Sequence, residues 1–490
     1  MGSSLTPAQA ALVLGGGISG LLAARELAAA GHSVTVLEAT ASWGGCVGSH
    51  VVAGLTLDSG AESFATRSSA VADLADELGL GGNVVVPRPG GAWVQLPDGP
   101  RELPKTGVLG IPANPWDPEV RRSLGFVGSL RASLDKYLPA SIGASADVTS
   151  VAALVRARMG RRVLDRLVVP VVGGVHSADP GLLDVDMVAP GLRAGIREHG
   201  SLAAAVAAQR RASTQPTVAK AGSAVAGLEG GMHTLVVALL SDLRSRGVAL
   251  MSGTAADAVE RTADGWRVTA GDTTHDGGLL VVALPGPAAV GLLQEAVPAL
   301  AGRSPESGPD VRLVTLVVDL PELDRRPRGS GILVSPQAPG IQAKALTHAT
   351  AKWDWLGAAA GPGTHVLRLS YGRLEASETA TPETDRLATA TPDAGGAAPA
   401  LDTELLAAAL HDASTLLDVP VQGTDVVGWD VVRWQGALPF AAVGHKARVA
   451  EVRKLCAAEA GLGIVGGWVA GNGLAAVVAD TRKEIRSLLS

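Results

Sequence analysis

The residues whose types and spacing could do chemistry lie close together near the start of the chain. Gly15, Gly17 and Gly20 form a G-x-G-x-x-G pattern, and the acidic residue Glu38 follows Gly20 by 18 positions. In such a pattern the first glycine permits a tight turn, the second lets the backbone approach a pyrophosphate, and the third lets a helix pack close to a strand. A carboxylate at this distance accepts hydrogen bonds from ribose hydroxyls. The spacing therefore predicts dinucleotide binding by Glu38 and by the glycine turn, whose other members are Gly16, Ile18 and Ser19.

The segments around these residues have the order that such a site needs. Residues 11–14 are a short apolar run that predicts a buried strand, residues 21–30 are rich in helix formers, and residues 34–37 are a second strand-like run. Strand, glycine turn, helix and strand together make a βαβ unit of about 30 residues. Beyond it, Gly44 and Gly45 predict another turn at which the backbone can come close to a cofactor.

The rest of the chain alternates between helical and extended patterns. We expect helices at residues 71–80, 151–169, 202–212 and, after a glycine turn, within 228–246. We expect strands at residues 255–261, 266–270 and 279–284, and turns with short strands at 87–118, where Pro and Gly crowd together. Residues 376–400 are low in complexity and rich in Ala, Thr and Pro, which predicts a surface loop.

Composition excludes several classes of protein. Of the 490 residues, 47% are hydrophobic and 18% are charged, which is unlike a disordered chain. The net charge of −6 gives no reason to expect nucleic-acid binding. Two cysteines, Cys46 and Cys456, are too few for a disulfide scaffold and fit a reducing compartment. No cluster has metal-ligand spacing, so no metal is expected.

The sequence shows neither of the usual signals for membrane insertion or secretion. No uninterrupted apolar run reaches the 18 residues of a membrane-spanning candidate. The first ten residues carry no Lys or Arg, so the basic start of a secretion signal is missing. We therefore expect a cytoplasmic protein with no transmembrane segment, and peripheral contact with a membrane stays open.

Several ordered stretches resemble one family over nearly the whole chain. The N-terminal unit through Gly45 is followed by LDSGAESF at residues 57–64, and RRVLDRLVVPVVGGVHSADP stands at 161–180. Further matching stretches lie at residues 227–232, 344–355, 431–445 and 466–483, the last reading GGWVAGNGLAAVVADTRK. These stretches resemble the protoporphyrinogen and coproporphyrinogen oxidases, a family of amine-oxidase-like FAD flavoproteins. The composition and the C-terminal motif resemble the actinobacterial coproporphyrinogen oxidases in particular.

The resemblance implies an interleaved α/β architecture. A Rossmann-like FAD-binding domain would be assembled from residues 1–90, 220–300 and 425–490. A substrate-binding domain with a mixed sheet would comprise residues 91–115 and 301–424. A helical domain, residues 116–219, would be inserted between them.

The resemblance also implies how FAD is held. The late motif in which some relatives attach the flavin covalently to a cysteine is absent around Cys456, so we expect noncovalent FAD. Cys46 stands where relatives often carry a basic residue, and its residue type favours a small buried apolar role. A helix N-terminus after Gly471 and Gly473 would point at the flavin ring. Beyond the residues already named, the implied contacts are Gly60, Ala61, Glu62, Ser63, Ala256, Leu474 and Ala475.

The activity implied by the resemblance is the oxidation of coproporphyrinogen III to coproporphyrin III in heme biosynthesis. Three hydride transfers to FAD would remove six electrons, and molecular oxygen would take them up as hydrogen peroxide. A contact with a downstream ferrochelatase would follow from this place in heme synthesis. Cations for the substrate's propionates are expected among Arg67, Lys344, Arg368 and Arg433.

Some roles stay unassigned. The family's propionate-binding arginine has no counterpart near residues 92–96. No catalytic base is assigned, because His176 and His445 have features that fit a structural role equally well.

Three alternatives stay open at this point. Protoporphyrinogen IX is the closest alternative substrate, with two propionates in place of four. A flavin amine oxidase or a carotenoid desaturase would use the same fold, but only Tyr137 and Tyr371 could supply tyrosines to an amine oxidase's aromatic cage. A non-enzymatic FAD protein that delivers porphyrin to a chelatase is the third.

Overall fold

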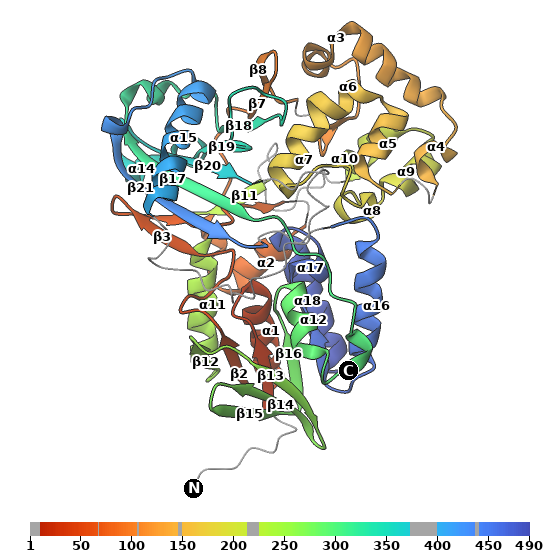
Figure 1. The fold of residues 1–490 in the computed structure, drawn as a ribbon, viewed down its shortest axis with the longest axis vertical. Helices are drawn as coiled ribbons and strands as arrows, with labels where there is room; N and C mark the ends of the chain where they lie inside the picture. Colours follow the sequence, from red (N-terminus) through yellow and green to blue (C-terminus); the bar gives the residue numbers. More distant parts are fainter. Residues whose placement is uncertain are drawn as a thin grey trace.

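The structure is a computed structural model, and it describes residues 10–66, 68–104, 107–145, 149–212, 225–372, 399–436 and 441–490. A parallel sheet with its helices occupies the lower half of Figure 1. The upper half holds a larger sheet on the left and a group of helices on the right. The loop expected at 376–400 lies outside the described residues up to 398, and its last two residues already belong to a helix.

The lower half is built on a five-stranded parallel sheet whose strands come from distant parts of the chain. Their order across the sheet is β12-β2-β1-β16-β22. The strands are β1 (Ala10–Leu14), β2 (Ser33–Glu38), β12 (Ala249–Ser252), β16 (Leu279–Val282) and β22 (Leu462–Ile464). All neighbouring pairs run parallel. The expected Rossmann-like sheet, assembled from N-terminal, middle and C-terminal segments, is therefore confirmed.

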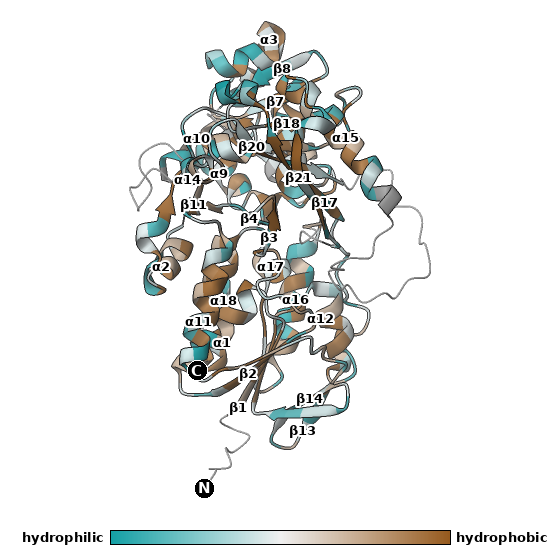
Figure 2. Ribbon diagram, turned by 90° about the vertical axis from the view of Figure 1, so that its left-hand side faces the viewer, coloured by the Kyte–Doolittle hydropathy of each residue, from teal (hydrophilic) through white to brown (hydrophobic). Residues whose placement is uncertain are grey.

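Both faces of this sheet are covered, as the apolar composition of its strands requires. One face packs against α1 (Ile18–Ala29), α2 (Ala70–Glu77), α11 (His233–Ser245) and α18 (Leu474–Leu488). The other packs against α12 (Gly286–Leu293), α16 (His445–Ala457) and the antiparallel strands β13 (Ala258–Thr262), β14 (Gly265–Ala270) and β15 (Thr273–Gly277). In Figure 2 the sheet strands and helices α1, α11 and α18 are mainly brown, that is, apolar.

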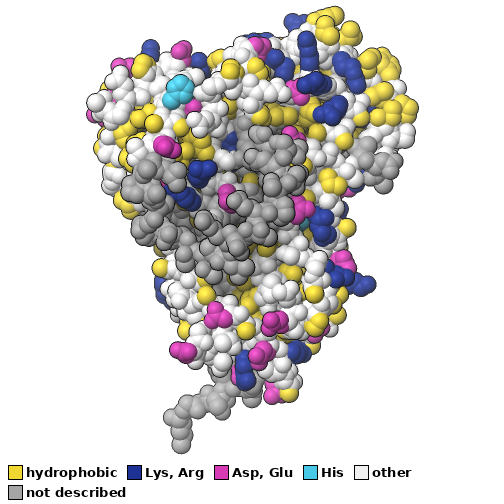
Figure 3. Space-filling view, viewed as in Figure 1, with side chains coloured by type: hydrophobic (Ala, Val, Ile, Leu, Met, Phe, Trp, Pro, Cys, Tyr) yellow, Lys and Arg dark blue, Asp and Glu magenta, His cyan; other side chains and the backbone are white. Residues whose placement is uncertain are grey.

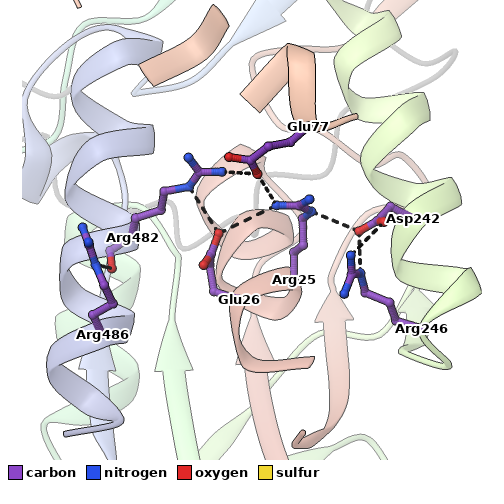
Figure 4. A network of polar contacts seen from close by, with 7 residues as sticks. All are labelled: Arg25, Glu26, Glu77, Asp242, Arg246, Arg482 and Arg486. Atoms are coloured by element: carbon purple, nitrogen blue, oxygen red, sulfur yellow. Dashed lines mark hydrogen bonds and ion pairs between the residues drawn. The ribbon is translucent and has the colours of Figure 1, made fainter. Parts of the chain in front are cut away.

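A network of ion pairs joins the helices on the first face (Figure 4). The guanidinium of Arg25 on α1 lies 2.6 Å from Glu77 on α2 and 3.0 Å from Asp242 on α11. Arg482 on α18 contacts the same Glu77 at 2.6 Å and Glu26 on α1 at 3.2 Å. Each helix of this layer is therefore tied to its neighbours at the protein surface as well as through the apolar core.

The upper half contains a seven-stranded mixed sheet in the order β21-β17-β20-β19-β18-β7-β8. Its strands are β7 (Trp93–Leu96), β8 (Gly99–Glu102), β17 (Val311–Asp319), β18 (Gly331–Val334), β19 (Ala345–His348), β20 (Thr364–Tyr371) and β21 (Val426–Trp434). Helix α15 (Pro399–Leu417) covers one face. The hairpin β3 (Ser49–Val52) and β4 (Leu55–Asp58) packs on the other.

One expected boundary differs from the sheet pairing. The FAD-binding segment was expected to begin at residue 425, but β21 lies in the seven-stranded sheet. It pairs with β17 along nearly its whole length, from Trp434 opposite Val311 to Val426 opposite Val318. Strand pairing with a distant segment decides this placement, and the local sequence does not reveal it.

The inserted helices form a separate apolar core around α5 and α7. They are α3 (Pro118–Ser133), α4 (Ser141–Ala144), α5 (Val151–Arg158), α6 (Arg161–Val163), α7 (Val169–His176), α8 (Val185–Val188), α9 (Leu192–His199) and α10 (Leu202–Ala212). The single helix expected at 151–169 is interrupted at Gly160, whose φ of 88° does not fit a helix.

A buried ion pair lies at the centre of these helices. Arg158 Nε is 2.5 Å from a carboxylate oxygen of Asp135, and both side chains are almost fully buried. The guanidinium also donates to the carbonyls of Pro139, Ile142 and Gly200. The carboxylate accepts the backbone N–H groups at the start of α10.

Short elements complete the fold. They are β5 (Phe64–Ala65), β6 (Val84–Val85), β9 (Gly107–Val108), β10 (Ile111–Pro112), β11 (Val225–Leu228), α13 (Ala349–Lys352), α14 (Asp354–Ala360) and α17 (Gly467–Ala470). Strand β11 pairs with both β5 and β6, beside the parallel sheet's helices. Among the described helices, none combines the length and the apolar character that crossing a bilayer requires.

Candidate functional site

The first glycine turn has the geometry that its spacing predicts. Gly15 has a φ of 102°, and its N–H donates to the carbonyl of Leu37 at 2.8 Å. A Cβ added to Gly20 would lie 1.9 Å from the Gly15 oxygen, so helix α1 could not approach the turn as closely with a side chain there. A Cβ on Gly17 would meet nothing within 4 Å. Gly17 precedes the first residue of α1, so open space lies at a helix N-terminus, where backbone N–H groups favour phosphate.

Glu38 links this turn to the next one. One carboxylate oxygen accepts the N–H of Gly16 at 2.6 Å. The other accepts both the N–H of Thr40 at 2.9 Å and its hydroxyl at 2.8 Å. The loop after β12 runs alongside, since Thr254 donates to the Glu38 carbonyl at 2.8 Å, and the half-buried Ala256 follows in that loop.

The second glycine turn packs directly on the first. Gly44 donates to the carbonyl of Gly16 at 2.8 Å and forms a short parallel bridge with Gly17. A Cβ on Gly45 would be 3.4 Å from the Gly17 Cα. The side chain of the next residue, Cys46, is accessible to solvent, where a small buried apolar role was expected. The protein packed around it nevertheless raises the pKa of its thiol by burial.

The turn at residues 59–63 rests on the same region. Ala61 donates to the Cys46 carbonyl at 2.8 Å, and a Cβ on Gly60 would lie 2.1 Å from that oxygen. Just before the turn, the Asp58 carboxylate accepts the backbone N–H of His233 at 3.0 Å, at the start of α11. Ser63 is partly buried at the end of the turn. Gly60, Ala61, Glu62 and Ser63 are thus brought to the first glycine turn through Gly44–Cys46.

Glu62 is the charged residue of this turn, and it pairs with one cation from helix α13 and one from strand β20 of the upper sheet. Its carboxylate pairs with the ammonium of Lys352 at the end of α13, and with Arg368 of β20 at 3.1 Å. Arg368 also donates to the Gly60 carbonyl at 2.7 Å. Burial acts to raise the pKa of Glu62, but the two neighbouring positive charges outweigh burial and hold that pKa below its usual range.

Helix α18 begins at the far side of the site. Gly471 and Gly473 have φ values of 95° and 107°, and a Cβ on either would meet nothing within 4 Å. Leu474 and Ala475 are the first residues of α18. The space in front of this helix N-terminus is therefore open, as a cofactor contact there requires.

Asn472, between these glycines, donates to Nδ1 of His176 at 3.0 Å. His176 ends α7, so this bond joins the start of α18 to the inserted helices. Burial lowers the pKa of His176 to about 4. The imidazole is therefore neutral near pH 7, and Nδ1 can accept the hydrogen bond.

The cations expected to contact a carboxylate substrate lie in different places. Lys344 is almost fully buried, and its ammonium donates to the hydroxyl of Ser177 and to the Gly372 carbonyl at 2.9 Å. Arg433 pairs with Asp402, on the α15 side of the upper sheet. Arg67 lies outside the described residues.

The other face of the upper sheet carries a partly exposed strip of small and apolar side chains. Leu313, Ser370, Ala345 and Leu333 are direct neighbours across β17, β20, β19 and β18, and all four are half-buried. Directly opposite residues share one face of a sheet, and alternation places Arg368 on that face too. The strip therefore ends at the cations that hold Glu62.

Helix α7 comes close to this strip. A Cβ on Gly174 would lie 2.5 Å from the side chain of Leu333. The end of α7 is also tied to α18 and to Lys344, as described above. One region between the two sheets and the inserted helices thus contains the glycine turns, the strip and the end of α7.

Comparison with known proteins places this arrangement in a family. The model of the family described as flavin containing amine oxidoreductase matches residues 18–475. The chain belongs to this family. The enzymes of the family are flavin-dependent oxidoreductases, which agrees with the glycine turns described above.

Named relatives match over nearly the whole chain. A coproporphyrinogen III oxidase of Mycobacterium leprae is 29% identical and covers 97% of both chains. One from Bacillus subtilis is 25% identical and covers 94% of both. A protoporphyrinogen oxidase of Arabidopsis thaliana is 29% identical over 47% of each chain. Among solved structures, a putative protoporphyrinogen oxidase from Exiguobacterium has a TM-score of 0.76 at 23% identity, covering 98% of both chains, which shows a shared fold.

Lys352 is a charged residue of this site that the sequence analysis did not single out. It lies inside the matching stretch 344–355, but its partner Glu62 is 290 positions away. A basic residue close to a Trp-rich turn carries no local signal of such a pair. Only the approach of α13 to the turn at residues 59–63 reveals it.

Proposed function

We propose that this protein binds FAD noncovalently and oxidises coproporphyrinogen III to coproporphyrin III in heme biosynthesis, with molecular oxygen as acceptor and hydrogen peroxide as product. The observation that carries the proposal is the match over 97% of both chains to a coproporphyrinogen III oxidase. A second support is the open space at the Cβ positions of Gly17, Gly471 and Gly473, before the N-termini of α1 and α18, which leaves room for an extended dinucleotide.

The residues fit FAD in this open space. Gly15–Gly20 and the start of α1 would hold the pyrophosphate, and Glu38 would exchange its present N–H partners for ribose hydroxyls. The turns at Gly44–Gly45 and Gly60–Ser63, and the start of α18, would contact the rest of the cofactor. When bound, FAD supplies the redox chemistry: it would accept a hydride from a substrate carbon and pass the electrons on to oxygen.

The chain's own contribution to the reaction is binding and orientation. The strip of Leu313, Ser370, Ala345 and Leu333 offers the flat, weakly polar surface that a tetrapyrrole needs. We propose that propionates extend toward the cations at its rim. Arg368 is the predicted cation that lies on this face. For Lys344 and Arg433, the partners described above occupy the charged groups, which supports a structural role.

The test compares substrates in the purified yellow protein. Initial rates of porphyrin formation are measured in air on coproporphyrinogen III and on protoporphyrinogen IX, together with peroxide release. We expect the faster rate on coproporphyrinogen III with peroxide in proportion. Faster oxidation of protoporphyrinogen IX would replace the substrate and keep the reaction, and rates equal to autoxidation on both would overturn the proposal.

We also propose that the protein works in the cytoplasm beside a ferrochelatase.

We further propose that the inserted helices contact an anionic membrane surface. Exposed apolar side chains occur on α3 and just after it, where Phe126 is 65% and Tyr137 is 73% exposed. Trp116, whose ring contacts that of Phe126, is also exposed, as are Val127, Leu130, Leu134 and Ile142. Figure 3 shows yellow hydrophobic atoms beside dark-blue Lys and Arg at the upper right, over α3.

Charge supports this contact. Residues 116–212 hold thirteen Lys and Arg and nine Asp and Glu, whereas the whole chain has a net charge of −6. An apolar patch within a basic region suits a negatively charged lipid surface. Cosedimentation with anionic vesicles should be lost on Phe126→Ser with Tyr137→Ser and kept on Val237→Ser, an exposed apolar control on α11. Equal binding by all three proteins would contradict the proposal.

A further inference from the structure

Glu62, Lys352 and Arg368 form a charged cluster at the turn of residues 59–63, which is expected to contact the flavin. Arg368 reaches the Gly60 carbonyl at 2.7 Å, within the turn expected to contact the cofactor. Trp434 donates to the carbonyl of Ser59 at 3.0 Å, so the upper sheet holds this turn from a second strand. The cluster thus lies where the turn at residues 59–63 meets the strip of Leu313, Ser370, Ala345 and Leu333.

The charges of the cluster do not cancel. Two cations, Lys352 and Arg368, face one carboxylate, Glu62, which leaves a net charge of +1. The exposed fractions of the side chains are 15% for Lys352, 9% for Arg368 and 17% for Glu62. Solvent therefore screens this charge weakly, and its field reaches neighbouring groups.

The cluster also has hydrogen-bonding capacity that the described residues do not use. Arg368 Nε is buried and meets no acceptor among them. Thr315 lies directly opposite Arg368 on β17, and its hydroxyl is likewise buried without a partner in the described part of the chain. Buried polar atoms are nearly always paired, so unused donors here point to a bound group.

We propose that this cluster raises the electron affinity of the bound flavin and so tunes it to accept hydride from the substrate. The inference rests on the proposed FAD binding. It assigns Lys352 and Arg368 as the source of the positive charge and Glu62 as the residue that positions them. A positive charge near the ring favours the form that has gained electrons, because that form carries more negative charge. Glu62 holds the two cations in place and at the same time offsets one of them.

The test uses the FAD-loaded protein without substrate. Sulfite binds oxidised flavin, and the adduct is stabilised by nearby positive charge, so its Kd reports the field at the ring. Lys352→Met removes a positive charge and keeps the chain length, and it should weaken sulfite binding about tenfold and lower the midpoint potential. Glu62→Gln removes the negative charge, and it should shift both quantities in the opposite direction. A tenfold change corresponds to about 1.4 kcal/mol.

Arg88→Met is the matched control. Arg88 is a nearby cation, because its backbone N–H donates to the Lys352 carbonyl. Its side chain pairs with the exposed Asp354 and not with the turn at residues 59–63. It should leave the sulfite Kd and the potential unchanged. Arg368→Lys keeps the charge and should shift the potential less than Lys352→Met does.

The outcomes separate this inference from the proposed function. Unchanged potentials in both charge variants, or shifts of the same sign, overturn the role of the cluster even if porphyrinogen is oxidised. If Lys352→Met does not retain FAD, the sign of the Glu62→Gln shift decides. Opposite shifts in a protein that oxidises no porphyrinogen would support the cluster and overturn the substrate. A wild-type protein that binds no FAD overturns both.

Discussion

Replacing Glu38 with glutamine should weaken FAD binding strongly while leaving the fold intact. The carboxylate of Glu38 accepts three hydrogen bonds, from the Gly16 N–H and from two groups of Thr40. Glutamine has one acceptor oxygen, so one side of the former carboxylate presents an NH₂ group to hydrogen-bond donors. When FAD is bound, the ribose hydroxyls would use the same oxygens.

The size of the effect follows from the lost bond. A hydrogen bond to a charged group contributes about 1.5–3 kcal/mol, which corresponds to roughly a 10- to 150-fold increase in the Kd for FAD. The measurement is a titration of the flavin-free protein with FAD, followed by the quenching of flavin fluorescence. Glu260→Gln, at an exposed position on β13, is the control and should change the Kd by less than about twofold.

Two results would refute this reasoning. An unchanged Kd for Glu38→Gln would show that Glu38 does not contact the cofactor. An equal loss in Glu260→Gln would show that net charge, and not the contact, controls the affinity. The melting temperature of the flavin-free protein separates a loss of contact from a loss of fold.

Three further predictions concern the glycine turn, the inserted helices and acid stability. Gly20→Ala should abolish FAD retention, because its Cβ would lie 1.9 Å from a backbone oxygen, whereas Gly82→Ala, with open space around it, should retain FAD on the purified protein. Arg158→Met should lower the free energy of unfolding by about 3–5 kcal/mol in denaturant titrations, since the buried carboxylate of Asp135 would lose its counter-charge; an unchanged midpoint would contradict this. Burial lowers the pKa of His348 to about 3, so the unfolded chain binds its proton first as the pH falls below about 6.5, and the melting temperature should drop from there toward pH 3. His348→Gln should make that drop smaller, and an identical pH profile would count against the histidine as its source.

The glycine turns and the unit around them could be predicted because their signals are local. A turn, a helix and two strands follow one another within residues 11–38, and each glycine has a mechanical reason at its own position. The helix at residues 202–212 was predicted with the bounds that α10 has, because the high helix propensity of alanine is summed over the whole segment.

Features that depend on distant contacts could not be predicted in this way. Gly160 interrupts an apparently continuous helical pattern, because its backbone has a φ of 88°, and an added Cβ would lie 2.9 Å from the side chain of Arg131 on a different helix. The placement of β21 depends on its pairing with β17, more than a hundred residues earlier in the chain. The cluster around Glu62 likewise combines residues from three segments.

The central claim is that this flavin-dependent oxidoreductase takes hydride from a porphyrinogen. The most direct test is anaerobic mixing of the FAD-loaded protein with coproporphyrinogen III, following the visible absorbance of the flavin. The account predicts rapid bleaching, porphyrin formation in proportion, and recovery of the yellow colour when air is admitted. Flavin that stays oxidised with coproporphyrinogen III, in a protein whose FAD is bleached by dithionite, would contradict it.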